Sequence, residues 1–220
     1  MKTTQQPYQF VAEPITSLAG QLLGVSVQTV LLNDGVHVQH RELVIRTWST
    51  DEKRNYLYEQ LSTITKQAAW ILKRGVTVSL PVCDEESAAL LSHDNALRYA
   101  LSSLPFVRLE LSESVSTVRD ELRGIRNAMW LSDLGKGDSD VSGLVTHNYD
   151  VVKLDNDFFN NEVIKPIFPI LIKNLREYCD RIIVPSFEDR RHVPMLREAG
   201  IWGVQGQYRT VPFTKVHTLM

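Results

Sequence analysis

Four polar residues of this sequence stand at or near the ends of short β-rich runs: Glu110, Asp133, Lys153 and Gln205. A barrel of parallel strands gathers its active site at the C-terminal ends of the strands, so these four side chains could share one site. Hard divalent cations bind oxygen ligands, above all carboxylates. Glu110 and Asp133 are therefore candidate metal ligands, and Lys153 and Gln205 are candidate lining residues.

Other strand ends carry residues that supply few or no metal ligands. These residues are Ser26, Pro81, Ser132 and Pro185. Proline has no side-chain oxygen, and two carboxylates do not easily complete the ligand shells of two Mg²⁺ ions. An isolated acid or lysine at a strand end is also more often an ion-pair partner than a catalyst. We therefore expect Lys153 to pair with Asp133 or Glu110 rather than to assist a reaction.

Alternating strand-like and helix-like segments position these residues. The runs from Tyr8 to Ile15 and from Gln21 to Leu32 predict a hairpin. A capping box at 49–52 predicts an amphipathic helix that reaches Arg74 and ends at Gly75. Further strands are predicted at 76–80, 106–111, 128–131, 151–154, 181–184 and 202–205, and further helices from residue 84, at 115–126, at 157–178 with interruptions at Pro166 and Pro169, and at 188–199.

This order of elements predicts an α/β protein. Repeated strand–helix units form a mostly parallel sheet, and about seven or eight units favour a closed barrel over an open sheet. The expected fold is a modified TIM-type (β/α)8 barrel in which the first hairpin makes one strand antiparallel. No linker rich in proline, glycine or serine divides the chain, so residues 1–220 are expected to form a single domain.

Composition narrows the classes of function. The net charge of −2 provides no basic excess for phosphates, so we expect no direct contact with nucleic acid. Cys83 and Cys179 lie far apart and show no metal-ligand spacing. The N-terminus lacks an apolar signal region, and no apolar run approaches the roughly 20 residues that span a bilayer. We expect a cytoplasmic protein with reduced thiols, without membrane contact and without a cofactor.

The strand ends also carry motifs in a family-specific order. They are Ser26-Val27-Gln28, Leu80-Pro81-Val82, Glu110-Leu111-Ser112-Glu113, Ser132-Asp133-Leu134-Gly135-Lys136-Gly137, Lys153-Leu154-Asp155, Pro185-Ser186-Phe187-Glu188 and Gln205-Gly206. This series resembles the EAL-domain family of bacterial cyclic-di-GMP phosphodiesterases. The family motifs are E-A-L, an Asn-bearing strand end, E-L-x-E, D-D-F-G-x-G, K-x-D, E-G-V-E and Q-G. The opening Glu13-Pro14-Ile15 is similar to the family's Q-P-I start.

The resemblance implies both a reaction and its loss. In the family, acidic and amide side chains hold two Mg²⁺ or Mn²⁺ ions, which activate a water for attack on a phosphodiester. Here Ser26 replaces the Glu of E-A-L, Pro81 replaces the Asn, Ser132 replaces the first Asp of D-D-F-G, and Pro185 replaces the first Glu of E-G-V-E. The resemblance therefore implies an inactive EAL-like barrel that is not an enzyme and holds no metal.

The resemblance also implies a partner. Degenerate single-domain EAL proteins of the YdiV type bind the FlhD subunit of the flagellar master regulator FlhDC and suppress motility genes. FlhD is therefore the expected partner, and the altered segment 136–138 leads us to expect a monomer when the chain is free. Two alternatives stay open: a receptor that binds cyclic-di-GMP without hydrolysing it, and a weakly active cyclic-di-GMP phosphodiesterase.

Overall fold

A long antiparallel hairpin supplies the first two strands of the fold. The computed structural model describes residues 8–33, 36–37, 41–112, 119, 121–122, 124–136, 144 and 148–219. Strand β1 (Tyr8–Thr16) pairs with β2 (Leu22–Asn33), with Tyr8 opposite Leu31 and Ile15 opposite Gly24. Gly20 adopts φ +86° in the connecting turn, a conformation that glycine adopts without steric cost. The predicted hairpin is confirmed.

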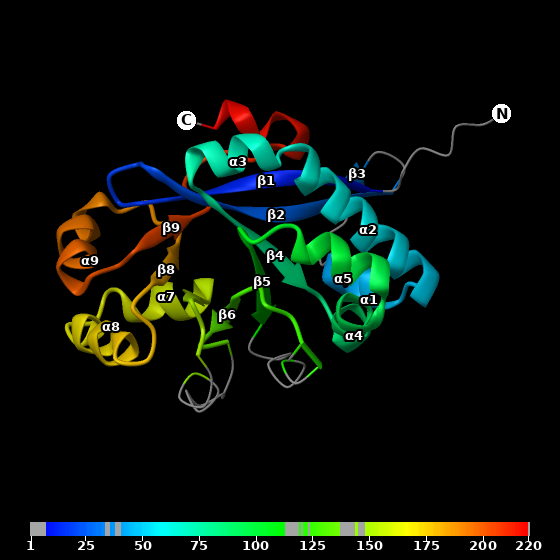
Figure 1. The fold of residues 1–220 in the computed structure, drawn as a ribbon. Helices are drawn as coiled ribbons and strands as arrows, with labels where there is room; N and C mark the ends of the chain where they lie inside the picture. Colours follow the sequence, from blue (N-terminus) through cyan, green and yellow to red (C-terminus); the bar gives the residue numbers. More distant parts are fainter. Residues whose placement is uncertain are drawn as a thin grey trace.

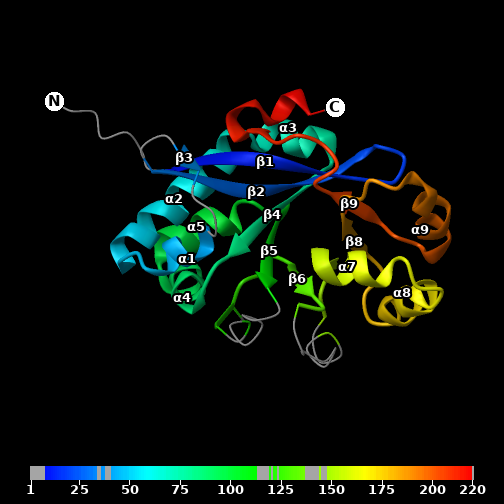
Figure 2. The same ribbon diagram turned by 180° about the vertical axis from the view of Figure 1, so that it is seen from behind.

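The remaining strands close the sheet into a barrel (Figures 1 and 2). From β2 onward the neighbours run parallel, in the order β4 (Thr77–Val82), β5 (Val107–Ser112), β6 (Met129–Leu134), β7 (Val151–Leu154), β8 (Ile182–Pro185) and β9 (Gly203–Gln205). Strand β9 then pairs antiparallel with β1, which places Ile15 opposite Gln205 and completes the ring. The predicted barrel with one antiparallel strand is confirmed.

Two short strands extend the ring, and neither was predicted. Strand β3 (Val36–His37) pairs with the end of β2, and β10 (Val211–Pro212) pairs with β1. A 3-10 segment, η3 (Phe213–Thr218), follows β10 and packs on β1 and the neighbouring helix, at the top of Figure 1.

Helices cover the outside of the ring between successive strands. In chain order they are α1 (Arg41–Arg46), α2 (Thr50–Lys66) and α3 (Ala68–Arg74) before β4, α4 (Glu85–His93) and α5 (Asn95–Ser102) before β5, α7 (Asn156–Glu162) and α8 (Phe168–Arg176) before β8, and η2 (Arg190–His192) with α9 (Val193–Ala199) before β9. Among the described residues, no helix is both long and apolar enough to cross a membrane.

Three of the predicted helices are divided in the structure. The helix that reaches Arg74 breaks at Gln67, and the helix that opens at residue 84 breaks at Asp94, whose carboxylate caps α5. The helix predicted at 157–178 is interrupted around Pro166, as expected. The segment 188–199 begins as a 3-10 turn at Arg190. Most of the helix predicted at 115–126 lies outside the described residues.

Two layers of apolar packing hold the barrel. Leucine, valine and isoleucine side chains on the outer faces of the strands pack under the helices in two large clusters. Inside the barrel, Ile15, Trp130, Val151 and Ile183 form a separate cluster, each no more than 1% exposed. This inner plug adjoins polar side chains on the same strand faces, because Trp130 is paired with Glu110 and Ile183 with Lys153.

Candidate functional site at the mouth of the barrel

Strand alternation brings the predicted residues to the inner face of the barrel. Successive side chains of a strand point to opposite faces, and residues paired across parallel strands share a face. Trp130 of the inner plug is paired with Glu110, which is itself paired with Pro81. In the same way Lys153 is paired with Ile183 of the plug, and Pro185 is paired with Gln205.

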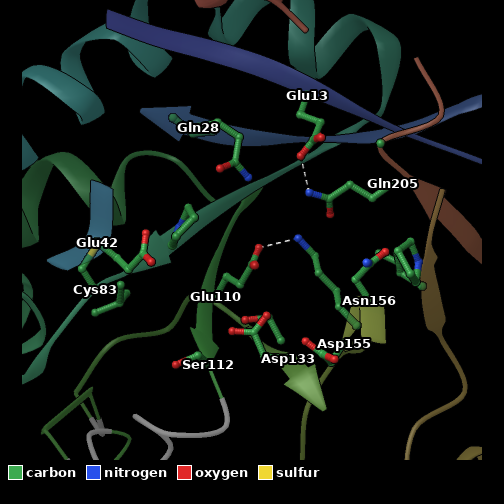
Figure 3. Close-up of a pocket in the computed structure, with 18 of the residues that line it drawn as sticks. Glu13, Gln28, Glu42, Cys83, Glu110, Ser112, Asp133, Asp155, Asn156 and Gln205 are labelled. Carbon is green, nitrogen blue, oxygen red and sulfur yellow. Dashed lines mark hydrogen bonds and ion pairs between the residues drawn. The ribbon is translucent and has the colours of Figure 1, made fainter. Parts of the chain in front are cut away.

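These side chains surround a cavity of about 560 Å³ at the C-terminal ends of the strands (Figure 3). The predicted site residues that line it are Pro81, Glu110, Ser132, Asp133, Lys153, Pro185 and Gln205. Ser26 is fully buried and is not among the lining residues, and its hydroxyl accepts a hydrogen bond of 2.9 Å from Gln28 Nε2. Glu113 and Gly137, which belong to two of the motifs, lie outside the described residues.

Glu110 is held by a buried ion pair. Its Oε2 atom lies 2.5 Å from Lys153 Nζ, and the two side chains are 11% and 8% exposed. The hydroxyl of Ser79 donates to the same oxygen. The ammonium also lies 5.3 Å from the centre of the Trp130 ring. Of the two partners that the sequence suggested for Lys153, the structure shows Glu110.

Asp133 occupies an unusual backbone position. Its φ is +58°, in the left-handed region, and the pairing of β6 with β7 shifts register between Leu131 and Leu134. Burial raises the pKa of the Asp133 carboxyl; Glu110 and Asp155 raise it further, and Lys136 opposes them. Within the described part of the chain no hydrogen bond reaches this carboxylate. Non-glycine residues at positive φ are uncommon and often occur at functional sites.

Two further acids of the cavity already accept hydrogen bonds from other groups. Glu13 Oε2 accepts a hydrogen bond of 2.5 Å from Gln205 Nε2, as drawn in Figure 3. Asp155 caps α7, because its Oδ1 accepts from the backbone N–H groups of Asp157 and Phe158 at 2.9 and 3.0 Å. The Asp155 carboxylate therefore serves the start of a helix.

Some cavity residues were not identified from the sequence as part of the site. They are Gln28, Glu42 and Asn156, together with Ser79, which is buried behind the lining and contacts Glu110. Ser79 carried a usable signal, because it alternates with Val78 and Leu80 in a strand and so had to face the interior. Glu42 had none, since it belongs to α1, a short helix that the sequence pattern did not predict.

The cavity does not fit a pair of divalent cations. Two such ions need many oxygen ligands between them, with near-octahedral geometry for Mg²⁺. Glu110 already contacts Lys153 and Ser79, Asp155 caps a helix, and the prolines at 81 and 185 offer no side-chain oxygen. No three His, Cys, Asp or Glu side chains within the described ranges are arranged to hold a metal ion.

We compared the chain with known proteins in sequence and in structure. No family model matches the chain. The chain is 22% identical over 210 residues to the cyclic di-GMP phosphodiesterase PdeH of Escherichia coli strain K12, an alignment that covers 91% of this chain and 82% of PdeH. The crystal structure of the EAL-like domain protein YdiV matches with a TM-score of 0.84 and 19% identity over 97% of each chain.

A second solved structure extends the comparison to an enzyme. The PaMucR phosphodiesterase in complex with c-di-GMP matches with a TM-score of 0.72 and 16% identity, over 98% of this chain and 95% of that one. Together with YdiV, it shows that this chain has the fold of EAL-domain proteins. The predicted fold class, a barrel of the EAL type, is confirmed.

Proposed function

We propose that this chain is a catalytically inactive EAL-like protein of the bacterial cytoplasm. It regulates flagellar gene expression and motility by binding the FlhD subunit of the FlhDC transcriptional regulator. The observation that carries the loss of catalysis is the contact between Lys153 Nζ and Glu110 Oε2 at 2.5 Å. To bind a metal ion through Oε2, the Glu110 carboxylate would have to give up its contacts with a buried ammonium and a serine hydroxyl.

The residues around that pair support the same proposal. Phosphodiester hydrolysis by two metals needs ligands that place both ions and a base that accepts the proton of the attacking water. Ser26 is sealed beneath Gln28, Ser132 has replaced an acid, and the prolines at 81 and 185 provide neither ligand nor base. Losing single catalytic groups typically slows a reaction by factors of about 10² or more, with strong coupling between them.

Two features support a protein as the ligand. The fold matches that of YdiV over 97% of each chain, and the resemblance to the YdiV type supplies FlhD as the partner. The charges that line the cavity disfavour an anionic dinucleotide, because acids outnumber bases. The acids are Glu13, Glu42, Glu110, Asp133 and Asp155, and the bases are Arg46, Lys136 and Lys153.

A hydrolysis assay tests the loss of catalysis. Purified protein is incubated with cyclic-di-GMP in Mg²⁺ and in Mn²⁺, with PdeH of Escherichia coli as the active control and metal alone as the blank. We expect no product above the blank in either metal. Reproducible product that scales with protein concentration would replace this proposal with the weakly active phosphodiesterase.

Size-exclusion chromatography tests the partner. Purified FlhD and this chain are run separately and together, and we expect a new peak that contains both proteins. A globular partner that meets a preformed surface buries roughly 1,200–2,000 Å² in total, which is enough for a complex that survives the column. Separate elution at micromolar concentrations of both proteins would remove FlhD as the partner.

A further inference from the structure

A second cavity, of about 740 Å³, opens at the N-terminal ends of the strands. Its lining includes Pro105, which precedes β5, and Asn127, which precedes β6. It therefore lies at the opposite end of the barrel from the mouth that holds Glu110 and Lys153. One wall is the exposed face of α5, and the other is the segment 124–127.

The α5 wall is a single helical stripe. Asn95, Arg98, Tyr99 and Ser102 are spaced at i, i+3, i+4 and i+7, so they lie along one face. The Tyr99 side chain is 75% exposed, which is high for a large aromatic residue. Arg126 stands on the opposite wall and is exposed, as Arg98 is.

Both arginines lack an anionic partner within the described ranges. No acidic residue is among the described residues that line the cavity. Two described acids on adjoining segments are engaged elsewhere: Asp94 pairs with Arg54 at 3.1 Å, and Glu121 faces His93 at 3.5 Å. A chain with a net charge of −2 thus presents a locally cationic cavity.

Several other polar groups of the cavity are already bonded. Asn127 Nδ2 donates to the carbonyl oxygens of Leu104 and Val107, each at 3.0 Å, and the Ser102 hydroxyl donates to the Tyr99 carbonyl at 2.8 Å. The first N–H groups of α5 donate to the Asp94 carboxylate. Among the described lining residues, the two guanidinium groups are therefore the cationic donors that remain for an anion.

The character of the remaining lining indicates the kind of anion. Leu101, Pro105 and Ile125 also line the cavity and contribute apolar groups to it. A phosphate site would use a free helix N-terminus or clustered backbone N–H groups, and the N-terminus of α5 is capped. Guanidinium groups bind carboxylates in a bidentate geometry, and tyrosine and arginine dominate the binding energy of protein interfaces.

We propose that this cavity docks an acidic segment of the protein partner. Carboxylates of that segment pair with Arg98 and Arg126, and an apolar side chain between them packs beside Tyr99 of the α5 wall. This inference rests on the proposed function to the extent that the partner is FlhD. It places the interface at the end of the barrel remote from the degenerate site.

Paired variants test the site with FlhD. The double variant Arg98→Glu/Arg126→Glu should raise the Kd for FlhD at least about 30-fold, because charge pairs buried at interfaces are costly to break. The matched control Arg74→Glu/Arg209→Glu changes two other exposed arginines by the same charge and should bind FlhD like the wild type. The triple variant Glu110→Ala/Asp133→Ala/Lys153→Ala, if folded by circular dichroism, should also retain binding.

A bulky substitution tests whether the partner enters the cavity, without changing the charge of the cavity. A Cβ added to Gly124 meets no described atom within 4 Å, and its φ lies outside the left-handed region, so a larger side chain is tolerated there. Gly124→Trp should obstruct the cavity and weaken FlhD binding without any change in charge. Unchanged FlhD binding by both the charge-reversal and the Gly124 variants would overturn the docking site.

If FlhD does not bind the wild type, an acidic peptide tests whether the cavity binds carboxylates. A fluorescein-labelled peptide of two glutamates, a leucine and two glutamates is titrated by anisotropy, with its glutamine analogue as the neutral control. Wild-type binding that is lost in the arginine double variant supports the site, even though the FlhD assignment has failed. Absence of wild-type binding, equal binding by the double variant, or displacement by millimolar inorganic phosphate overturns it.

Discussion

At the scale of single residues, breaking the Glu110–Lys153 ion pair should strongly lower the free energy of unfolding. Replacing Lys153 by Met leaves a buried carboxylate without its partner, which typically costs roughly 3–5 kcal/mol. Lys165 is a matched control, because it pairs with Glu162 at 2.6 Å while its side chain is 50% exposed. Lys165→Met should cost below about 1 kcal/mol.

Urea denaturation measures both variants. The free energy of unfolding should fall far more in Lys153→Met than in Lys165→Met, and the double variant Lys153→Met/Glu110→Gln should regain part of the loss. Equal effects of the two single substitutions would show that the buried pair contributes no more than a surface pair.

Asp133 should give the protein a pH-dependent stability. Burial raises the pKa of this carboxyl above its ordinary 3.8, so the folded state favours the protonated acid. The stability that this group contributes is complete below pH 3.8 and is lost as the pH rises through the raised pKa. Asn cannot ionise and tolerates the left-handed backbone, so Asp133→Asn should be more stable than the wild type at pH 7.

The measurement is the difference in unfolding free energy between Asp133→Asn and the wild type from pH 4 to pH 8. That difference should grow as the pH rises. A difference that stays constant across this range would mean that the Asp133 carboxyl does not titrate abnormally.

Ser132 provides a repair experiment. Ser132→Asp restores one acid of the family motif, but the positions of Ser26, Pro81 and Pro185 remain without ligands. We expect no cyclic-di-GMP hydrolysis, and a small loss of stability because the new charge adjoins Asp133. Hydrolysis by this single variant above the metal blank would show that the correspondence of strand ends is wrong.

At the scale of elements, the turn after β6 is fixed by its contact with α7. Gly135 has φ +93°, and a Cβ there would lie 2.4 Å from Cγ of Phe158 on α7. Gly75 also has a positive φ, of +65°, but an added Cβ meets no described atom within 4 Å. Gly75→Ala should therefore cost only the backbone penalty of roughly 1–2 kcal/mol.

Gly135→Ala should cost clearly more, because the Phe158 ring must move as well. Thermal denaturation of the two variants tests this order. A melting temperature for Gly135→Ala at or above that of Gly75→Ala would show that the Phe158 ring of α7 moves aside at little cost.

The strands were easier to predict than the limits of the helices. Period-two alternation is carried by many residues, so the hairpin and the six later strands were found near their observed ends. Helix breaks depend on single tertiary contacts. The break at Asp94 arises because its carboxylate both caps α5 and meets Arg54, and the sequence pattern contains no sign of that second contact.

The site was predicted to the extent that strand ends determine it. Glu110, Asp133, Lys153 and Gln205 all line the cavity, since parallel strands end at one edge. The sequence left two possible ion-pair partners for Lys153, Glu110 and Asp133. Choosing Glu110 required the registers of β5 on β6 and of β6 on β7. The exclusion of Ser26 from the lining required the position of the Gln28 side chain above it.

At the scale of the whole molecule, the charge of the mouth predicts its behaviour toward cyclic-di-GMP. The dinucleotide carries two phosphate charges, and acids outnumber bases among the described residues that line the mouth. Isothermal titration with Mg²⁺ present should give no binding heat, with PdeH as the positive control. Saturable binding without hydrolysis would favour the receptor alternative.

The closure of the barrel also has a consequence for how the protein is made. Strand β1 needs β9 as its second neighbour, and the hydrogen bond between Gln205 and Glu13 joins residues 192 apart in sequence. At roughly 5–20 residues per second, a ribosome takes about 10–40 s to cover that distance. During that interval the edge of β1 that β9 will cover lacks its partner, so the nascent chain carries an unpaired strand edge until almost the whole barrel has been translated.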